Sequence, residues 1–259
     1  MFDPASMVPA SNLSFANSVD TAQHRDLARR AAAESIVLLR NQAVAGKANG
    51  DGGAVLPFGP GVKDIAVIGP NANRTMSLVS NYPGCKTAPG GPLVPDCNLT
   101  TPLDGIVAAA ASRGARVRFA QGCDIDTADT SRFEEALVAA HAADVVVFVG
   151  GLITCQETGD QCQEAEAKDR VNVTLPGVQP DLLRALNGTN LIVVIESGST
   201  VSIPFEAQNA PAILQMFYPG LQRTVYTSIA PFVASQYAPW HEVLIVLLIS
   251  RQVKKAALH

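Results

Sequence analysis

One apolar run limits the folds open to this chain of 259 residues. Val145–Val149 is an unbroken stretch of β-branched and aromatic side chains that ends at Gly150-Gly151. A strand without alternating polar residues is typical of a sheet that is buried on both faces, as parallel sheets are. We therefore predict an open α/β sheet that contains this strand. In such sheets ligands bind at the carboxyl ends of the strands, which here means the loop after Gly151.

That loop is rich in acidic side chains. Its five carboxylates fall within thirteen residues: Glu157, Asp160, Glu164, Glu166 and Asp169. Neighbouring carboxylates oppose one another's ionisation, so one of them can stay protonated near neutral pH, as a general acid must. The alternative is an acidic loop that is merely solvated.

The remaining apolar segments complete a doubly wound sheet. We predict mostly parallel strands near 36–39, 65–68, 116–120, 145–149, 191–195 and 212–216. Helices are expected over 24–34 after N-cap candidates at 20–23, from Thr101 through Ala111, over 133–142 with Ser131 as the cap, and over 178–186. For the third helix the predicted apolar face is Phe133, Leu137, Val138 and Ala140. The alternation of strands and helices favours helices on both faces of the sheet.

Composition excludes several classes of partner. The net charge is -4 and no basic run exceeds two residues, so nucleic acid is not an expected partner. The longest apolar run, 243–249, has seven residues, too few for a membrane span. No strand is followed by a phosphate-binding glycine motif, which disfavours a nucleotide cofactor. The amino terminus has no basic and apolar leader of the secretory type.

Other features are typical of secreted proteins. Five Asn-X-Ser/Thr sequons occur, at Asn12, Asn73, Asn98, Asn172 and Asn187. Two local disulfides are possible, Cys85 with Cys97 and Cys155 with Cys162, which would leave Cys123 unpaired. Five free thiols are the alternative. Metal ligation is disfavoured because no histidine lies near a cysteine pair, and we expect no metal.

The sequence of the acidic loop resembles that of a known family. The motifs are Gly151-Leu152, Gln163-Glu-Ala-Glu-Ala-Lys-Asp-Arg170 and Leu175-Pro-Gly-Val-Gln179. They are similar to the second, α/β domain of glycoside hydrolase family 3, in the branch of β-xylosidases, α-L-arabinofuranosidases and related β-glucosidases. Gly69-Pro70-Asn71 and Tyr218-Pro219-Gly220 match further family segments in the right order.

The resemblance implies a retaining exo-glycosidase that acts on β-xylosides or related glycosides in cell-wall breakdown, needs no cofactor and is secreted. It implies Glu166 as the acid/base, with Glu164 as the fallback. Asp169, Arg170, Asn81 and Tyr82 are the implied substrate-binding residues, although Tyr82 could equally be a half-buried loop aromatic. The nucleophile, an aspartate, would come from a preceding (β/α)8 barrel that this chain lacks.

Two stretches depart from the family pattern. The segment between Leu152 and Gln163 is longer than usual, and the likeness ends near residue 222, after which no glycine follows the 20 that precede. We predict a linker-like arm over 1–20, the α/β domain over 21–222 and a divergent tail over 223–259. The tail is either the product of a changed reading frame or splice choice, or a genuine divergent helix, and it should be the least well packed part.

Two other functions stay open. The chain could be a catalytically inactive fragment or a sugar-binding module, since half an active site cannot turn over a glycoside. Flavodoxin-like nucleotide binding is disfavoured by the missing phosphate loop.

Overall fold

A six-stranded sheet forms the centre of the protein. The computed structural model describes residues 4, 7–14, 18, 21–44, 53–78, 99–154, 162–166 and 168–220. The strands are β1 (Val37–Asn41), β2 (Asp64–Ile68), β3 (Arg116–Ala120), β4 (Val145–Gly151), β5 (Leu191–Glu196) and β6 (Ala212–Met216), in the order β1-β6-β5-β4-β2-β3. All six predicted strands are present, which confirms the α/β class.

The sheet is mostly parallel, as predicted. Strand β2 pairs in parallel with β3 and β4, and β4, β5 and β6 continue the parallel order. Strand β1 is the exception, because it pairs antiparallel with β6 and has an irregular register between Leu38 and Arg40. The central strands β4 and β5 are fully buried along their length, as their continuous apolar runs require.

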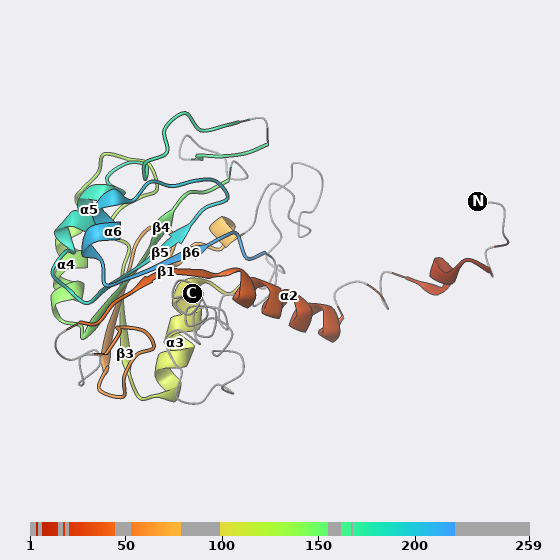
Figure 1. Ribbon diagram of the computed structural model, residues 1–259, viewed down its shortest axis with the longest axis horizontal. Coiled ribbons are helices and arrows are strands. Elements are labelled where there is room, and N and C mark those ends of the chain that lie inside the picture. The colour runs from red at the N-terminus through yellow and green to blue at the C-terminus, as the bar shows by residue number, and fades with distance from the viewer. Residues whose placement is uncertain are drawn as a thin grey trace, which may run out of the picture.

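Helices cover both faces of this sheet (Figure 1). The helices are α2 (Ala22–Ser35), α3 (Pro102–Ser112), α4 (Phe133–His141), α5 (Gln179–Ala185) and α6 (Pro204–Asn209), with short 3-10 turns at Pro9–Asn12 and Met76–Leu78. Helix α3 packs through Ile106 and Ala110 on one face of the sheet. Helices α4 and α5 pack on the other, where Leu182, Leu183 and Leu186 contact the core. The predicted two-faced arrangement is therefore present.

Local capping explains where two of the helices begin. The Thr101 side chain accepts a hydrogen bond from the Asp104 amide, and the Asp104 carboxylate accepts one from the Thr101 amide, so α3 starts with a capping box and Pro102 in its first turn. At α2 the Thr21 hydroxyl accepts from the His24 amide. Both starts agree with the sequence prediction.

Helix α4 differs from its prediction. Its N-cap is Arg132 and no side chain caps it, so Ser131 is not the cap. The buried stripe is Ala136, Ala139 and Ala140, whereas Val138 is 65% exposed. Phe133, Leu137 and Ala140 of the predicted face do pack on the core, and alanines let the helix backbone approach the sheet closely, so only Val138 is misplaced.

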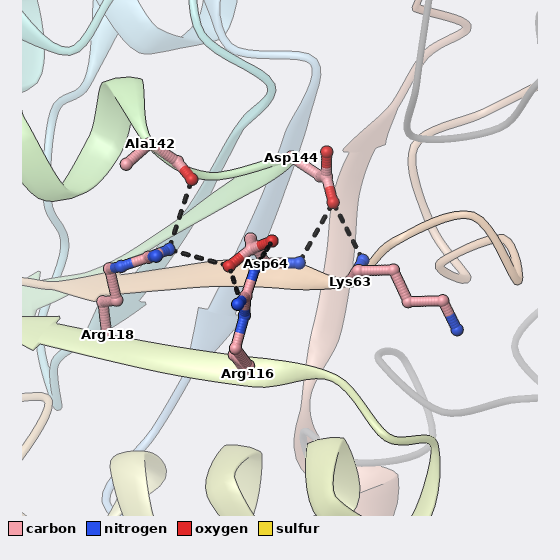
Figure 2. Close-up of polar contacts among 6 residues, drawn as sticks. All are labelled: Lys63, Asp64, Arg116, Arg118, Ala142 and Asp144. Carbon is pink, nitrogen blue, oxygen red and sulfur yellow. Dashed lines mark hydrogen bonds and ion pairs between the residues drawn. The ribbon is translucent and has the colours of Figure 1, made fainter.

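At the amino ends of the strands, charged side chains join β2, β3 and β4 (Figure 2). The Asp64 carboxylate forms ion pairs with Arg116 and Arg118, each at 2.8 Å. The Asp144 carboxylate accepts hydrogen bonds from the Lys63 and Asp64 amides at 2.8 and 3.0 Å. The hydrogen bond from Arg116, with help from Arg118, holds the pKa of Asp64 below its ordinary value. These ion pairs and hydrogen bonds connect the strands at their amino ends. The candidate site lies at the opposite edge, at the carboxyl ends of the strands.

Candidate functional site

The parallel order brings four chain segments together at the carboxyl edge of the sheet. Asn71 follows β2, Leu152 and Thr154 follow β4, Gly198 and Ser199 follow β5, and Tyr218 follows β6. A cavity of about 290 Å³ lies there. It is lined by Thr154, Glu164, Ala165, Lys168, Asp169, Arg170, Gly198, Ser199 and Tyr218. The acidic loop therefore meets the strand ends as the sequence predicts.

Glu164 is the buried carboxylate of this site. Its side chain accepts hydrogen bonds from the Gly198 amide at 2.7 Å, from the Ser199 hydroxyl and from the Tyr218 hydroxyl. Only 9% of the residue is exposed. Burial, followed by the hydrogen bond to Glu164, raises the pKa of the Tyr218 phenol above its ordinary value, so the phenol remains a donor to the carboxylate. Both carboxylate oxygens are thus already occupied within the domain.

Glu166, two residues further on, lies in an exposed turn. The turn is closed by two backbone hydrogen bonds, from the Ala165 amide to the Lys168 carbonyl at 3.4 Å and from the Lys168 amide to the Ala165 carbonyl at 3.1 Å. Ala165 and Lys168 both line the cavity. The two glutamates of the motif therefore have opposite environments, one buried and bonded and the other open to solvent.

The two other predicted residues of this loop also line the cavity. Asp169 is exposed. The Arg170 guanidinium donates to the Thr200 carbonyl at 3.1 Å and to the Thr174 carbonyl at 2.6 Å. These contacts hold the loop to the segment after β5, which is a positioning role that the motif alone did not indicate.

A second carboxyl group lies deeper. Glu196, the last residue of β5, is fully buried and accepts a hydrogen bond from the Asn71 side chain at 3.2 Å. Its other carboxyl oxygen has no hydrogen-bond partner. Burial raises the pKa of Glu196 to about 8, which outweighs the opposite effect of its polar neighbours. Burial therefore favours the protonated form of Glu196 at neutral pH. Sequence reasoning missed it, since a strand that ends in glutamate gives no sign of how deep that residue lies.

Gln179 fixes the position of the strand end beneath the site. Its side-chain oxygen accepts from the Gly151 amide at 2.8 Å. Its nitrogen donates to the carbonyls of Ile125 and Gly151 at 2.8 and 2.9 Å. The side chain is completely buried at the first turn of α5. Only the resemblance of the segment that ends at Gln179 could have drawn attention to it.

Glycines allow the strand ends to approach each other. Gly151 has φ +139°, and a Cβ there would lie 2.1 Å from the Glu196 carbonyl oxygen. Gly69, at the end of β2, has φ +119°, and its Cβ would lie 2.2 Å from the Val149 carbonyl oxygen. No side chain fits at either position. The close spacing of β2, β4 and β5 at the site depends on these two residues.

Some predicted residues cannot be placed. Asn81, Tyr82, Cys85, Cys97 and Cys155 lie outside the described ranges, as does the tail after residue 220. Cys162 is disulfide-bonded, whereas Cys123 is a free, buried thiol, as expected for the cysteine left unpaired. Within the described ranges no three metal-ligating side chains gather, and no helix is long and apolar enough to cross a membrane.

Comparison with known proteins identifies the family. Residues 36–239 match the model of the glycosyl hydrolase family 3 C-terminal domain. An exo-1,4-beta-xylosidase from Emericella nidulans is 37% identical over 199 residues, which cover 75% of this chain and 21% of that protein. A beta-xylosidase/alpha-L-arabinofuranosidase from Medicago sativa is 33% identical over 225 residues, covering 84% of this chain and 24% of its own length.

The solved structures agree. A family 3 exo-beta-xylosidase in complex with a xylobiose aziridine probe has a TM-score of 0.68 and 31% identity, over 89% of this chain and 26% of its own. A beta-glucosidase from Bifidobacterium adolescentis has a TM-score of 0.64 and 29% identity, over 88% of this chain and 29% of its own.

This chain spans only 21–24% of the length of the two curated relatives above. The matched region nevertheless covers well over half of the chain, from the first strand past the last. The chain therefore belongs to glycosyl hydrolase family 3, and it corresponds to the C-terminal domain of that family.

Proposed function

We propose that this domain supplies the acid/base residue of a retaining exo-glycosidase that acts on β-xylosides or related pentosides. The observation that carries the proposal is the exposed Glu166, in a turn between two residues of the cavity wall at the carboxyl edge of the sheet. Relatives named as β-xylosidases give the substrate class. The nucleophile would be an aspartate on a (β/α)8 barrel that packs against this edge.

The chemistry needs two carboxyl groups about 5 to 5.5 Å apart. Glu166 protonates the leaving oxygen while the nucleophile attacks the anomeric carbon, which gives a covalent glycosyl-enzyme. The Glu166 carboxylate then takes a proton from water as the water attacks the same carbon, and this step releases the sugar and restores both carboxyl groups.

The environments of the two glutamates favour Glu166 for this role. A general acid must reach the substrate oxygen directly, at about 2.6–3.2 Å. Glu166 is exposed, so its carboxyl group is open to a substrate. Glu164 also lines the cavity, but it is buried and already accepts three hydrogen bonds, which makes it the less accessible of the two carboxyl groups.

We also propose that the protein is secreted and glycosylated. Cys162 is disulfide-bonded, a bond that the reducing cytosol does not favour. The four sequon asparagines within the described ranges, Asn12, Asn73, Asn172 and Asn187, are all exposed. Expression in a eukaryotic secretory host, with mass measurement before and after removal of N-glycans, tests this.

The catalytic proposal is tested in an enzyme that contains a barrel. The full chain is joined behind the preceding part of the Emericella nidulans exo-1,4-beta-xylosidase, and Glu166→Gln is compared with the parent fusion. We expect roughly a 10²- to 10⁴-fold loss on aryl xylosides with poor leaving groups and a much smaller loss on those with good ones, because good leaving groups depart without protonation. Azide should partly restore turnover by attacking the glycosyl-enzyme.

The matched control is Glu135→Gln, on the exposed face of α4, which should behave like the parent. A Glu166→Gln enzyme whose losses are equal for good and poor leaving groups would contradict the assignment. If Glu164→Gln showed the leaving-group pattern instead, the acid would be the other glutamate of the pair.

A further inference from the structure

We propose that Glu164 is a positioning residue that holds the Glu166 turn at the catalytic edge. This inference rests on the proposed role of Glu166 and adds to it. The Glu164 carboxylate acts through the backbone and does not touch the substrate. Its partners lie on two different chain segments, Gly198 and Ser199 after β5 and Tyr218 after β6.

The backbone around Glu164 is bonded on its other side as well. The amides of Gln163 and Glu164 both donate to the Ile153 carbonyl, at 3.0 and 3.4 Å, and Glu164 forms a parallel bridge with Thr154. Ile153 is the second residue after the end of β4. Glu164 is therefore fixed by its backbone to β4 and by its side chain to the ends of β5 and β6.

The turn that carries Glu166 begins at the next residue. The paired hydrogen bonds between Ala165 and Lys168 close it. Beyond it, Arg170 donates to the Thr200 carbonyl, so both flanks of the turn are attached to the same segment, 198–200. Because the chain is attached on both sides of the turn, the turn cannot easily shift along the carboxyl edge of the sheet.

Glu164 is the stronger of the two attachments. It is buried and accepts three hydrogen bonds, whereas Arg170 is only partly covered and donates one hydrogen bond to this segment. Displacing a catalytic group by about 1 Å can cost about 100-fold in rate. Weakening the hydrogen bonds of Glu164 should therefore displace Glu166 without altering the carboxyl group of Glu166.

The first experiment uses the chain itself and does not depend on catalysis. Amide hydrogen exchange is measured in the parent, in Glu164→Gln and in Tyr218→Phe. Glu164→Gln should speed exchange at the Ala165 and Lys168 amides at least tenfold and leave the amides of β4 unchanged. Tyr218→Phe, which removes one bond and keeps the other two, should show a smaller effect. Unchanged exchange at Ala165 and Lys168 in both variants would overturn the proposal.

The second experiment uses the barrel fusion described above. For Glu164→Gln we expect kcat/KM on poor leaving groups to fall about 10- to 100-fold, while its decline on the alkaline side of the pH profile remains. Glu166→Gln should abolish that decline, because the proposed proton donor is gone. Tyr218→Phe serves as the milder variant if Glu164→Gln fails to fold, and it should show the same retained decline with about a 3- to 10-fold loss.

The two proposals fail separately. If Glu166→Gln retains the alkaline decline, the acid is not Glu166. The exchange measurement still tests whether Glu164 holds the turn. If Glu166→Gln abolishes the decline but Glu164→Gln and Tyr218→Phe both match the parent, Glu164 has no positioning role. If Glu164→Gln is the variant that abolishes the decline, Glu164 is itself the acid, and its assignment as a positioning residue is overturned.

Discussion

Glu196 should make the stability of the domain depend on pH. Burial raises its pKa to about 8, so the folded state binds a proton that the unfolded state has released above about pH 4.5. Stability from this group is therefore greatest in acid and declines as the pH rises towards 8, by about 1.4 kcal/mol per pH unit. Glu196→Gln should remove this decline and give the more stable protein at pH 8. Denaturant unfolding at several pH values measures it, and an unaltered slope would contradict the assignment.

Gln179 should be necessary for stability although it touches no substrate. Gln179→Leu keeps the volume but leaves the Gly151 amide and the carbonyls of Gly151 and Ile125 without their partner. The expected loss is about 3 kcal/mol, near 1 kcal/mol for each buried group. The exposed Gln208→Leu is the control and should stay within about 0.5 kcal/mol. Equal unfolding midpoints for the two variants would show that the Gln179 bonds are replaceable.

For single residues, only part of the candidate site could be predicted from the sequence. The position of the acidic loop at a strand end followed from the apolar run and the glycines after it. The difference between Glu164 and Glu166 did not, because the partners of Glu164 lie 34 to 54 residues away along the chain. No local pattern can indicate which of two nearby glutamates a distant tyrosine will cover.

Among the strands and helices, the carboxyl end of β4 should be the least tolerant of substitution. Gly151→Ala combines a positive φ with a contact of 2.1 Å to the Glu196 carbonyl oxygen, so β4 and β5 would have to separate. We expect a loss of about 3 kcal/mol or more. Gly114 also has a positive φ, +64°, but its Cβ would meet nothing within 4 Å. Gly114→Ala should cost about 1 kcal/mol, from the backbone alone. Thermal unfolding of both variants separates crowding from backbone preference.

The elements themselves were largely predictable. Continuous β-branched runs gave the buried strands, and Thr101, Pro102 and Asp104 gave the start of α3, because these signals act within a few residues. The direction of β1 was not predictable, since pairing with β6 joins segments more than 170 residues apart. The burial of α4 was also misjudged at Val138, because the fit of a helix on a sheet depends on the strands beneath it.

For the whole molecule, we expect this chain alone to be inactive on aryl xylosides. Proton transfer by a general acid contributes about 10²- to 10⁴-fold, whereas nucleophilic attack and most substrate contacts would belong to the barrel. Activity should appear in the barrel fusion. Substantial turnover by the isolated chain, retained through purification and lost in Glu166→Gln, would mean that both catalytic carboxylates lie within these 259 residues.

The buried Cys123 gives the domain a built-in chemical reporter. Its side chain is enclosed in the core beside α5, and burial raises the pKa of the thiol to about 12, so the reactive thiolate is almost absent from the closed protein. An alkylating reagent can then modify Cys123 only when the core cluster that it shares with Leu182 and Leu183 of α5 opens. The rate of labelling at Cys123, followed by peptide mass spectrometry, therefore measures how often this part of the core opens, without any introduced probe.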